Sequence, residues 1–327
     1  MPTIVIALFD HSLPSAITGV IDMFSLSNLS LVQSAKGMSG TWPPDIITAS
    51  HDGKPVTDGQ GKSMAVDADF ASITACDAVI VPGFAPNAQG CPPAALVSEQ
   101  AKRWLIRQYQ HKAMICGSCS GVFALGEANL LANHRCTTTW WLHDELKQRF
   151  PTAKAEWASE LIADRRIVTA GGPMSWINIT LHIVKELAGA DMAKIMSDLA
   201  VVDTQPKSQN LYAPEGYINS TNPFLAKAEF TIRQAHLCNI SAQGLANAMS
   251  VSQRTLHRKL LHLTGETPKK FIDRVRIEQA CTLLNTGKKS VKSIALALGY
   301  SDDTVFRRLF RRRMGITPTA YRQRLIQ

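Results

Sequence analysis

Cys119 is the residue whose sequence neighbours best suit it to act as a nucleophile. An apolar run over residues 113–115 leads through Cys-Gly-Ser into Cys119-Ser120-Gly121, and an apolar segment of helical character follows. A strand that turns into a helix through such a tripeptide predicts a nucleophile elbow, which presents the reactive side chain at a sharp turn. The adjacent helix N-terminus is expected to lower the pKa of the thiol and favour the thiolate.

Two further features accompany this elbow. Val81-Pro82-Gly83 ends the preceding apolar run, and backbone N–H groups there are candidates for stabilising an oxyanion. Cys116 and Cys119 form a Cys-x-x-Cys pair, a spacing found in thiol redox centres and in half of a zinc site. No second cysteine or histidine pair completes a zinc site, so we predict no metal or other cofactor. Cys116 is expected to be packed within its strand, which leaves an inert pair or a redox switch as alternatives.

An internal repeat near the C-terminus predicts DNA binding. Residues 245–274 align with residues 294–324, so that Leu256 matches Phe306 and Gly265 matches Gly315. Each copy predicts a short helix, a tight turn and a second helix with a basic outer face, the arrangement that places a helix in the major groove. Ser252 is expected to cap the first recognition helix, and the two glycines to end the recognition helices.

The outward faces of the two recognition helices supply the predicted contacts. Arginine can bind guanine bidentately, and Thr or Gln can reach other base edges. The residues expected to point inward are Leu256, Leu260, Leu263, Val305, Phe306, Leu309 and Phe310. The predicted DNA-binding residues are Gln253, Arg254, His257, Arg258, Asp303, Thr304, Arg307, Arg308 and Arg311. The predicted phosphate contacts are Lys259, Lys269, Lys288, Lys289, Arg312 and Arg313.

The charge distribution also favours a polyanionic partner. The chain has 327 residues and a net charge of +9, but the segment from Phe224 to the end carries +13 and the remainder carries −4. Seven cysteines in a chain of this length do not indicate a secreted disulfide framework. We find no signal-peptide pattern and no apolar run long enough to span a membrane. We therefore expect a cytoplasmic, nucleoid-associated protein.

Strands and helices alternate in the N-terminal part, which predicts an α/β domain around a mainly parallel sheet. The expected strands are residues 3–9, 46–49, 78–81, 113–115 and 167–169. The expected helices are residues 16–29, 94–109, 122–131, 142–150 and 177–187. The predicted division is a domain over residues 1–201, a linker over 202–223 and an all-α domain over 224–327, with residues 268–284 as the helix joining its two repeats.

The last hundred residues or so resemble the AraC family of transcription regulators. The motifs that carry the resemblance are SQRTLHRKLLHLTGETPKKF and SIALALGYSDDTVFRRLFRRRMGITPTAYR. The resemblance implies a seven-helix unit with two recognition helices, and it assigns base or backbone contacts to Arg254, Arg258, Thr304 and Arg308. Asp302-Asp303 departs from a basic pattern, because carboxylates favour the helix dipole but repel phosphate. They also accept hydrogen bonds from cytosine, which leaves the base preference open.

Residues 3–200 resemble the class I glutamine amidotransferase-like superfamily, in its PfpI-like branch. The motifs are GVIDMF, VIVPGF, the CSG elbow and VTAGGPMSWINITLHIVKEL. The resemblance implies a flavodoxin-like parallel-sheet sandwich. In the enzymatic relatives a His follows a Thr-Thr pair, where this chain has Thr139, and an acidic residue occupies a place that falls near Ser15 and Ala16 here. Because two catalytic partners are missing, we interpret Cys119 as a vestige and the chain as not an enzyme.

These features predict a transcriptional regulator that binds double-stranded promoter DNA. Its N-terminal domain is expected to bind an unknown small-molecule effector or to form a homodimer, and RNA polymerase is an implied partner if the chain is an activator. The expected ligand pocket at the elbow consists of Gly83, Cys119, Thr139 and Trp140. The alternative is a cysteine-dependent hydrolase or amidotransferase that carries a DNA-binding domain.

Overall fold

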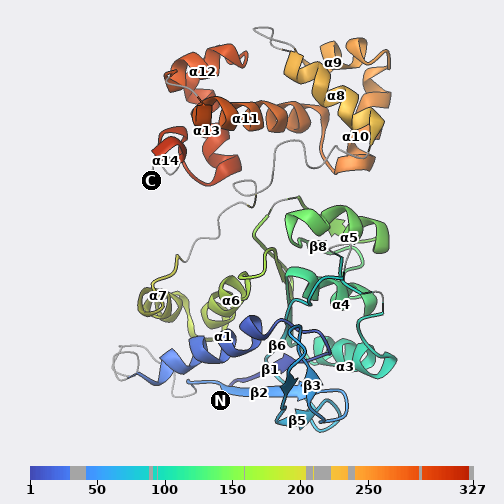
Figure 1. Ribbon diagram of the computed structural model, residues 1–327, viewed down its shortest axis with the longest axis vertical. Helices are drawn as coiled ribbons and strands as arrows, with labels where there is room; N and C mark the ends of the chain where they lie inside the picture. The colour runs from blue at the N-terminus through green and yellow to red at the C-terminus, as the bar shows by residue number, and fades with distance from the viewer. Residues whose placement is uncertain are drawn as a thin grey trace. The chain divides into compact units, whose positions relative to one another are not determined.

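The computed structural model divides the chain into two compact units, Met1–Gln209 and Asn210–Gln327 (Figure 1). The residues it describes are 1–29, 42–87, 91–93, 95–157, 159–203, 209, 222–234, 240–286 and 289–323. Most of the predicted linker over residues 202–223 therefore lies outside the described residues.

A seven-stranded sheet forms the centre of the N-terminal unit. Its strand order is β10-β11-β7-β6-β1-β2-β5, and every pairing is parallel except that of β10 with β11. The strands are β1 (Thr3–Ala7), β2 (Asp45–Ser50), β5 (Ala68–Asp69), β6 (Ala78–Val81), β7 (Met114–Ser118), β10 (Leu161–Asp164) and β11 (Ile167–Ala170). Parallel strands end at the same edge, so the turns after β1, β6, β7 and β11 lie along one side of the sheet.

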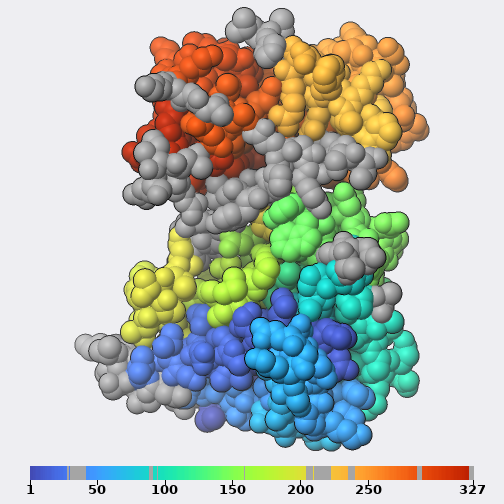
Figure 2. Space-filling view, viewed as in Figure 1, coloured from blue at the N-terminus to red at the C-terminus, as the bar shows by residue number. Residues whose placement is uncertain are grey.

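Helices cover both faces of this sheet, which is why its strands read as continuous apolar runs. One apolar cluster packs α1 (Pro14–Ser25), α6 (Trp176–Ala188) and α7 (Ala190–Leu199) on one face. The other packs α3 (Glu99–Gln110), α4 (Val122–Glu127) and α5 (His143–Arg149) on the opposite face. The two helical layers are separate in Figure 1, and α7 (yellow) and α3 (teal) lie on opposite sides of this unit in Figure 2. The predicted α/β fold class is confirmed.

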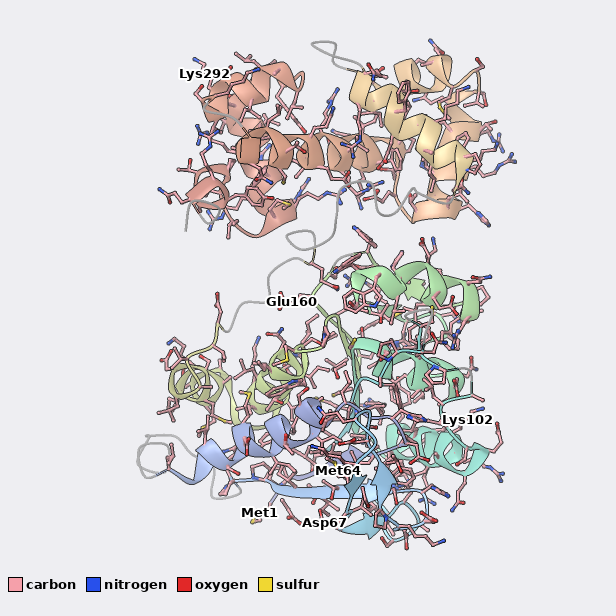
Figure 3. The ribbon with its side chains drawn as sticks, viewed as in Figure 1. Met1, Met64, Asp67, Lys102, Glu160 and Lys292 are labelled. Atoms are coloured by element: carbon pink, nitrogen blue, oxygen red, sulfur yellow. The ribbon has the colours of Figure 1, made fainter. Side chains whose placement is uncertain are left out.

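The five predicted strands are present, but several short elements were not predicted. Residues 68–69 form the edge strand β5. Asp67, labelled in Figure 3, precedes this strand and accepts hydrogen bonds from the backbone and side chain of Thr48. Two small ribbons pair β3 (Val56–Thr57) with β4 (Ser63–Met64) and β8 (Arg135–Cys136) with β9 (Lys154–Ala155). Two-residue strands are too short to give a periodic signal. Helix α3 begins later than predicted, because Ser98 caps it by accepting from the N–H of Ala101.

The C-terminal unit is helical in all its described elements, as predicted. Its helices are α8 (Pro223–Gln234), α9 (Ala242–Ala248), α10 (Gln253–Thr264), α11 (Pro268–Thr286), α12 (Val291–Ala297), α13 (Asp303–Met314) and α14 (Pro318–Gln323). One apolar cluster joins α8, α9 and α10 to the first half of α11, and a second joins α12, α13 and α14 to its second half. Helix α11 therefore connects two similar subdomains (Figure 1).

The predicted helix ends in the C-terminal unit are confirmed. Ser252 Oγ accepts from the N–H of Thr255 at 3.1 Å and so caps α10. Gly265 and Gly315 end α10 and α13 in the left-handed conformation, with φ of 72° and 75°. A residue with a side chain is strained in that conformation, which explains glycine at both positions. The repeat in the sequence is thus a repeat of backbone geometry.

A buried ion-pair network crosses between the two subdomains. Arg274 on α11 is 2% exposed and pairs with Glu229 of α8 (3.3 Å), Glu266 (2.9 Å) and Glu278 (2.7 Å). Arg233 of α8 also pairs with Glu278 at 2.7 Å, and Arg313 of α13 pairs with Glu266 at 2.9 Å. Three guanidiniums thus balance three carboxylates, so that no charge in the network is buried without a counter-charge.

The two most buried carboxylates of this network differ in electrostatic balance. Burial acts to raise the pKa of Glu266, but the guanidiniums of Arg274 and Arg313 outweigh it and hold the pKa below its ordinary value. Burial raises the pKa of Glu229, which Arg274 offsets only in part. Ionised Glu266 therefore stabilises the folded chain, whereas the ionisation of Glu229 costs stability.

We expect Glu266→Gln to lower the free energy of unfolding by about 3 kcal/mol at pH 7, because it leaves two guanidiniums short of a partner. The contribution of Glu266 is present above the ordinary Glu pKa of about 4.3 and is lost as the pH falls through its lowered folded pKa. The effect should therefore shrink in urea unfolding at pH 4. Glu229→Gln is the matched control and should cost clearly less at pH 7. Equal losses of unfolding free energy for both variants at pH 7 would contradict the stabilising role of ionised Glu266.

Candidate nucleic-acid interface and cysteine elbow

The first helix-turn-helix consists of α9 and α10, and α10 has two distinct faces. Leu256 and Leu260 are fully buried against the first subdomain core, as predicted, and Leu263 is half-buried. The predicted DNA-facing side chains are exposed along the other side of the helix: Gln253, Arg254, His257 and Arg258. The structure thus brings these four residues together on one surface. Lys259 lies beside them, with its ammonium 4.7 Å from the centre of the Phe224 ring.

The second helix-turn-helix consists of α12 and α13 and repeats this arrangement. Phe306 and Phe310 are fully buried, while Thr304, Arg307, Arg308 and Arg311 are exposed and Asp303 is half-exposed. Arg307, Arg308 and Arg311 lie at helical spacing on one face. That face therefore carries three positive charges within two turns.

The inward orientation predicted for Val305 is wrong. Val305 is 45% exposed, because α11 does not cover this flank of α13. It lines a groove of about 420 Å³ between the two helices. The groove also contains four cationic side chains and two acidic ones: Lys269, Arg276, Arg308, Arg312, Asp273 and Asp302. We call it the basic groove.

The two acidic residues at the start of α13 both have partners within the chain. Asp302 is the cap of α13, and its Oδ1 accepts from the N–H of Thr304 at 2.8 Å. This backbone hydrogen bond holds the pKa of Asp302 below its ordinary value. Asp303 pairs with Arg307 one turn later at 2.9 Å. The departure from a basic pattern is therefore explained by helix capping and by orientation of an arginine.

The phosphate contact predicted for Arg313 is not supported by its surroundings. Its guanidinium is bound within the unit, by Glu266 Oε1 and by the backbone carbonyl of Lys270, both at 2.9 Å. Local sequence did not reveal this, because Glu266 lies in the preceding repeat. Lys269, Lys289 and Arg312 are exposed, and Lys288 lies outside the described residues.

Cys119 lies at the predicted elbow, directly after β7 and before α4. Its φ is +53°, the left-handed conformation that side-chain-bearing residues rarely adopt and that a nucleophile elbow requires. The turn is possible because Gly121 has no side chain: a Cβ there would come within 2.4 Å of the carbonyl oxygens of Val81 and Pro82. The sequence predicted this geometry correctly.

The predicted lowering of the Cys119 pKa is wrong. Cys119 is 4% exposed, and this burial raises the pKa of its thiol to about 11, although hydrogen bonds from Ser120 act in the opposite direction. Burial likewise raises the pKa of Cys116, which packs within β7 as expected. Both thiols are free. Loss of solvation outweighs the effect of the short helix α4.

Two hydroxyls at the elbow, those of Ser120 and Thr138, are engaged in hydrogen bonds to the backbone. Ser120 Oγ accepts from the N–H of Phe84 (2.7 Å) and donates to its carbonyl (3.1 Å). Thr138 Oγ1 donates to the carbonyl of Cys119 at 2.7 Å. His134 lies 3.5 Å from Asp164, and His143 packs edge-on against Trp157. Neither histidine has a described contact with the Cys119 thiol.

Two of the residues predicted for a ligand pocket, Gly83 and Cys119, lie against each other. A Cβ on Gly83 would come within 3.1 Å of the Cys119 Cβ. Thr139 is fully buried and Trp140 is half-exposed. Among the described residues, the buried hydroxyls of Ser118 and Thr139 have no hydrogen-bond partner. An orphaned buried hydroxyl costs free energy, and Ser118 directly precedes the elbow cysteine.

Sequence reasoning missed one residue beside this site. Gln209 is 4% exposed, and its side chain bonds to the backbone of Thr138, Trp140 and Ser159. A single glutamine in a polar segment carries no signal of such a contact, and it is separated by 69 positions from Trp140.

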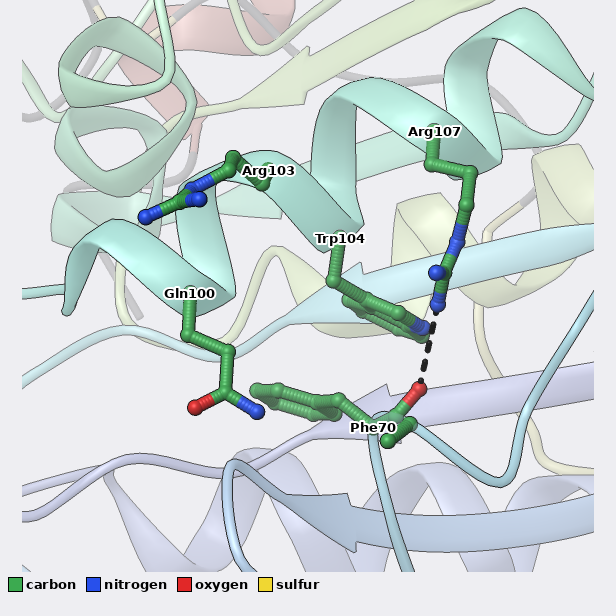
Figure 4. Close-up of a pocket in the computed structure, with 6 residues that line it drawn as sticks. Phe70, Gln100, Arg103, Trp104 and Arg107 are labelled. Atoms are coloured by element: carbon green, nitrogen blue, oxygen red, sulfur yellow. Dashed lines mark hydrogen bonds between the residues drawn. The ribbon is translucent and has the colours of Figure 1, made fainter.

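A different hollow lies between α3 and the segment at Phe70 and Ala71, and it has a volume of about 480 Å³ (Figure 4). Trp104 stacks on Phe70 with ring centres 4.3 Å apart, and Arg107 donates to the Phe70 carbonyl at 3.5 Å. Arg103 is exposed beside them, and it belongs to the N-terminal unit rather than to either helix-turn-helix motif. It therefore provides a basic surface residue for control experiments.

No group of three or more His, Cys, Asp or Glu side chains in the described part of the chain is placed to hold a metal ion. Within the same residues, no helix has the length and apolar character needed to cross a membrane.

Two family models match different parts of the chain. A helix-turn-helix domain model matches residues 245–324, and the DJ-1/PfpI family model matches residues 35–186. The transcriptional regulator ArgR of Pseudomonas aeruginosa is 25% identical over 73% of this chain and 76% of its own length. The regulator GbdR of the same species is 24% identical over 93% and 83%. The activator RhaS of Escherichia fergusonii is 39% identical, but over 26% of this chain and 30% of its own.

Solved structures support the fold of the N-terminal unit. An AraC family transcriptional regulator from Pseudomonas putida superposes with a TM-score of 0.50 at 19% identity, covering 61% of this chain and all of that one. A THiJ/PfpI family protein from Pseudomonas syringae also gives 0.50, at 20% identity over 76% and 89%.

The buried elbow predicts a slowly reacting thiol. At pH 7.5 we expect iodoacetamide to modify Cys119 about tenfold more slowly than the half-buried Cys91, because only the thiolate reacts and burial disfavours it. The rate at Cys119 should rise steeply as the pH approaches 11. Peptide mass spectrometry of the labelled full-length protein measures both sites in one sample. If Cys119 is labelled as fast as Cys91 at pH 7.5, its thiol is not held protonated by burial, and a catalytic role is favoured.

Proposed function

We propose that this chain is an AraC-type helix-turn-helix transcriptional regulator with a DJ-1/PfpI domain, and that each unit has its own role. The C-terminal unit binds double-stranded promoter DNA, and the N-terminal unit senses a small molecule. The observation that carries the first role is a pair of equivalent helices, α10 and α13, whose exposed faces both bear two or more arginines.

The length of α11 suits simultaneous binding by both helices. It has 19 residues, which corresponds to about 28 Å of helix. One recognition helix packs near each end, and successive major-groove faces are about 34 Å apart. Gln253, Arg254, His257 and Arg258 are the proposed contacts of the first helix. Asp303, Thr304, Arg307, Arg308 and Arg311 are those of the second, with Asp303 holding Arg307 in place.

The basic groove is the proposed place for a backbone phosphate beside the second recognition helix. Arg308 lines both the groove and the outward face of α13, so it can join phosphate binding to base reading. The exposed Val305 at the same edge offers an apolar contact for a thymine methyl group.

Sensing is proposed for the elbow side of the N-terminal unit. The two unpartnered hydroxyls support a polar ligand, and the residues proposed to line its pocket are Gly83, Cys119, Thr139 and Trp140. Catalysis by Cys119 is not favoured, because its thiol is protonated at neutral pH and no base is bound to it among the described contacts. We also propose that the chain forms a homodimer and that it is located in the cytoplasm, associated with the nucleoid. If it is an activator, it also contacts RNA polymerase.

Loss of one arginine from either recognition helix should weaken specific binding. We expect Arg258→Ala and Arg308→Ala each to reduce affinity for DNA from upstream of the protein's own gene about tenfold or more, because a bidentate contact to guanine is worth about 1–3 kcal/mol. Fluorescence anisotropy at fixed salt measures this. Arg103→Ala, which removes an equal charge from α3, should have no effect. Equal losses for all three variants would mean that only net charge matters.

A phosphate contact has a different signature. Arg312→Ala should weaken binding to specific and to random duplexes by a similar factor, and it should lower the slope of log affinity against log salt concentration by about 1. A loss confined to the specific duplex would show that Arg312 reads bases instead.

A further inference from the structure

Gln209 is the last residue of the N-terminal unit, and its side chain is held inside that unit. Its Oε1 accepts from the backbone N–H of Trp140 at 2.8 Å. Its Nε2 donates to the backbone carbonyls of Thr138 (2.9 Å) and Ser159 (2.6 Å). The last residue of the N-terminal unit is therefore attached at the elbow side of the sheet through its buried carboxamide.

The groups around Gln209 select a carboxamide by their chemistry. Two carbonyl oxygens accept only hydrogen bonds, and one backbone N–H donates only, so the ligand group must offer two N–H donors on one side and an acceptor on the other. A carboxylate of the same shape would place an oxygen against the carbonyls of Thr138 and Ser159. This pattern also fixes which side-chain atom of Gln209 is nitrogen.

Gly171 leaves the space that the carboxamide occupies. It follows β11, and a Cβ at this position would lie 2.0 Å from Nε2 of Gln209 and 2.5 Å from the carbonyl oxygen of Thr138. The backbone at Gly171 is held by its N–H, which donates to the carbonyl of Glu160 at 2.8 Å. Glu160 itself is labelled in Figure 3. Any larger residue at 171 would exclude the amide.

This carboxamide is coupled to the elbow through one residue. Thr138 accepts from Gln209 with its carbonyl and donates to the carbonyl of Cys119 with its hydroxyl. The next residue, Thr139, has the unpartnered buried hydroxyl described above. Any group that takes the place of the Gln209 carboxamide thus contacts Thr138, which is also bound to the elbow residue Cys119.

We propose that Thr138, Trp140, Ser159 and Gly171 form a binding site for a primary carboxamide. Gln209 is its resident occupant, and a small molecule bearing a primary carboxamide displaces the Gln209 side chain from it. The inference rests on the proposed sensing function and deepens it by naming the ligand class. A tethered group competes at an effective concentration of about millimolar, so a free amide has to exceed that level or bind through additional contacts at the elbow.

The test uses the full-length protein and acetamide, the fragment that Gln209→Ala removes from the side chain. Lys207 is the only Lys or Arg between residues 202 and 223, so tryptic cleavage after it reports on attachment of the segment nearby. We expect Gln209→Ala to be cleaved there about tenfold faster than the unmodified chain. Acetamide should accelerate cleavage of the unmodified chain and leave that of Gln209→Ala unchanged.

Binding of acetamide is measured separately, from the midpoint of thermal unfolding of the Gln209→Ala variant. Acetamide should raise it, because the ligand binds the folded state, whereas acetate and N,N-dimethylacetamide at equal concentration should not. The control variant is Gln110→Ala at the exposed end of α3, which should match the unmodified chain in both assays. Gln209→Asn, whose amide is one methylene too short, should give intermediate cleavage if the Ala variant does not fold.

Two outcomes would overturn the inference. Equal cleavage of the unmodified chain and both Gln209 variants would show that Gln209 does not hold the segment. Faster cleavage of the variants without any effect of acetamide in either assay would show a structural contact that admits no ligand. Neither assay contains DNA, so a failure to bind DNA would contradict the proposed function and leave this inference standing.

Discussion

The interaction on which the DNA-binding unit depends is the buried ion network around Arg274. A guanidinium removed from water is costly unless its charge is balanced, and three carboxylates supply that balance through bonds to Nε and Nη1 of Arg274. Since Glu229 belongs to α8 and Glu266 also binds Arg313 of α13, the network ties both subdomains to α11. The apolar clusters on their own are separate, one at each end of this helix. The network and the rigidity of α11 therefore set the spacing of the two recognition helices.

In the N-terminal unit the corresponding constraint is the common edge at which the parallel strands end. The turns after β6, β7 and β11 meet there, and they bring Gly83, Cys119 and Gly171 into one region from distant parts of the sequence. The same edge receives Gln209 from the end of the unit. A fold that elsewhere positions a reactive thiol here holds a protonated one, together with unpartnered hydroxyls and a bound carboxamide. That combination is the basis of the proposed sensing role.

Much of this architecture could be predicted because its signals are local. Runs of β-branched residues gave the central strands, and the repeated pattern of Leu256 and Phe306 gave both helix-turn-helix motifs. Capping by Ser252 and the left-handed glycines followed from residue type. The errors have a common cause, since burial is set by distant residues. The pKa of Cys119, the exposure of Val305 and the partner of Arg313 all depend on packing between segments. Gln209 shows the limit most clearly, because nothing near it in the sequence indicates its binding site.

The measurement that tests the central claim most directly is a hydroxyl-radical footprint of the full-length protein on DNA from upstream of its own gene. Two recognition helices joined by α11 predict two protected patches on one face of the duplex, with centres about one helical turn apart. A single patch, or protection that follows no sequence, would contradict the account of α10 and α13 as paired readers of the major groove.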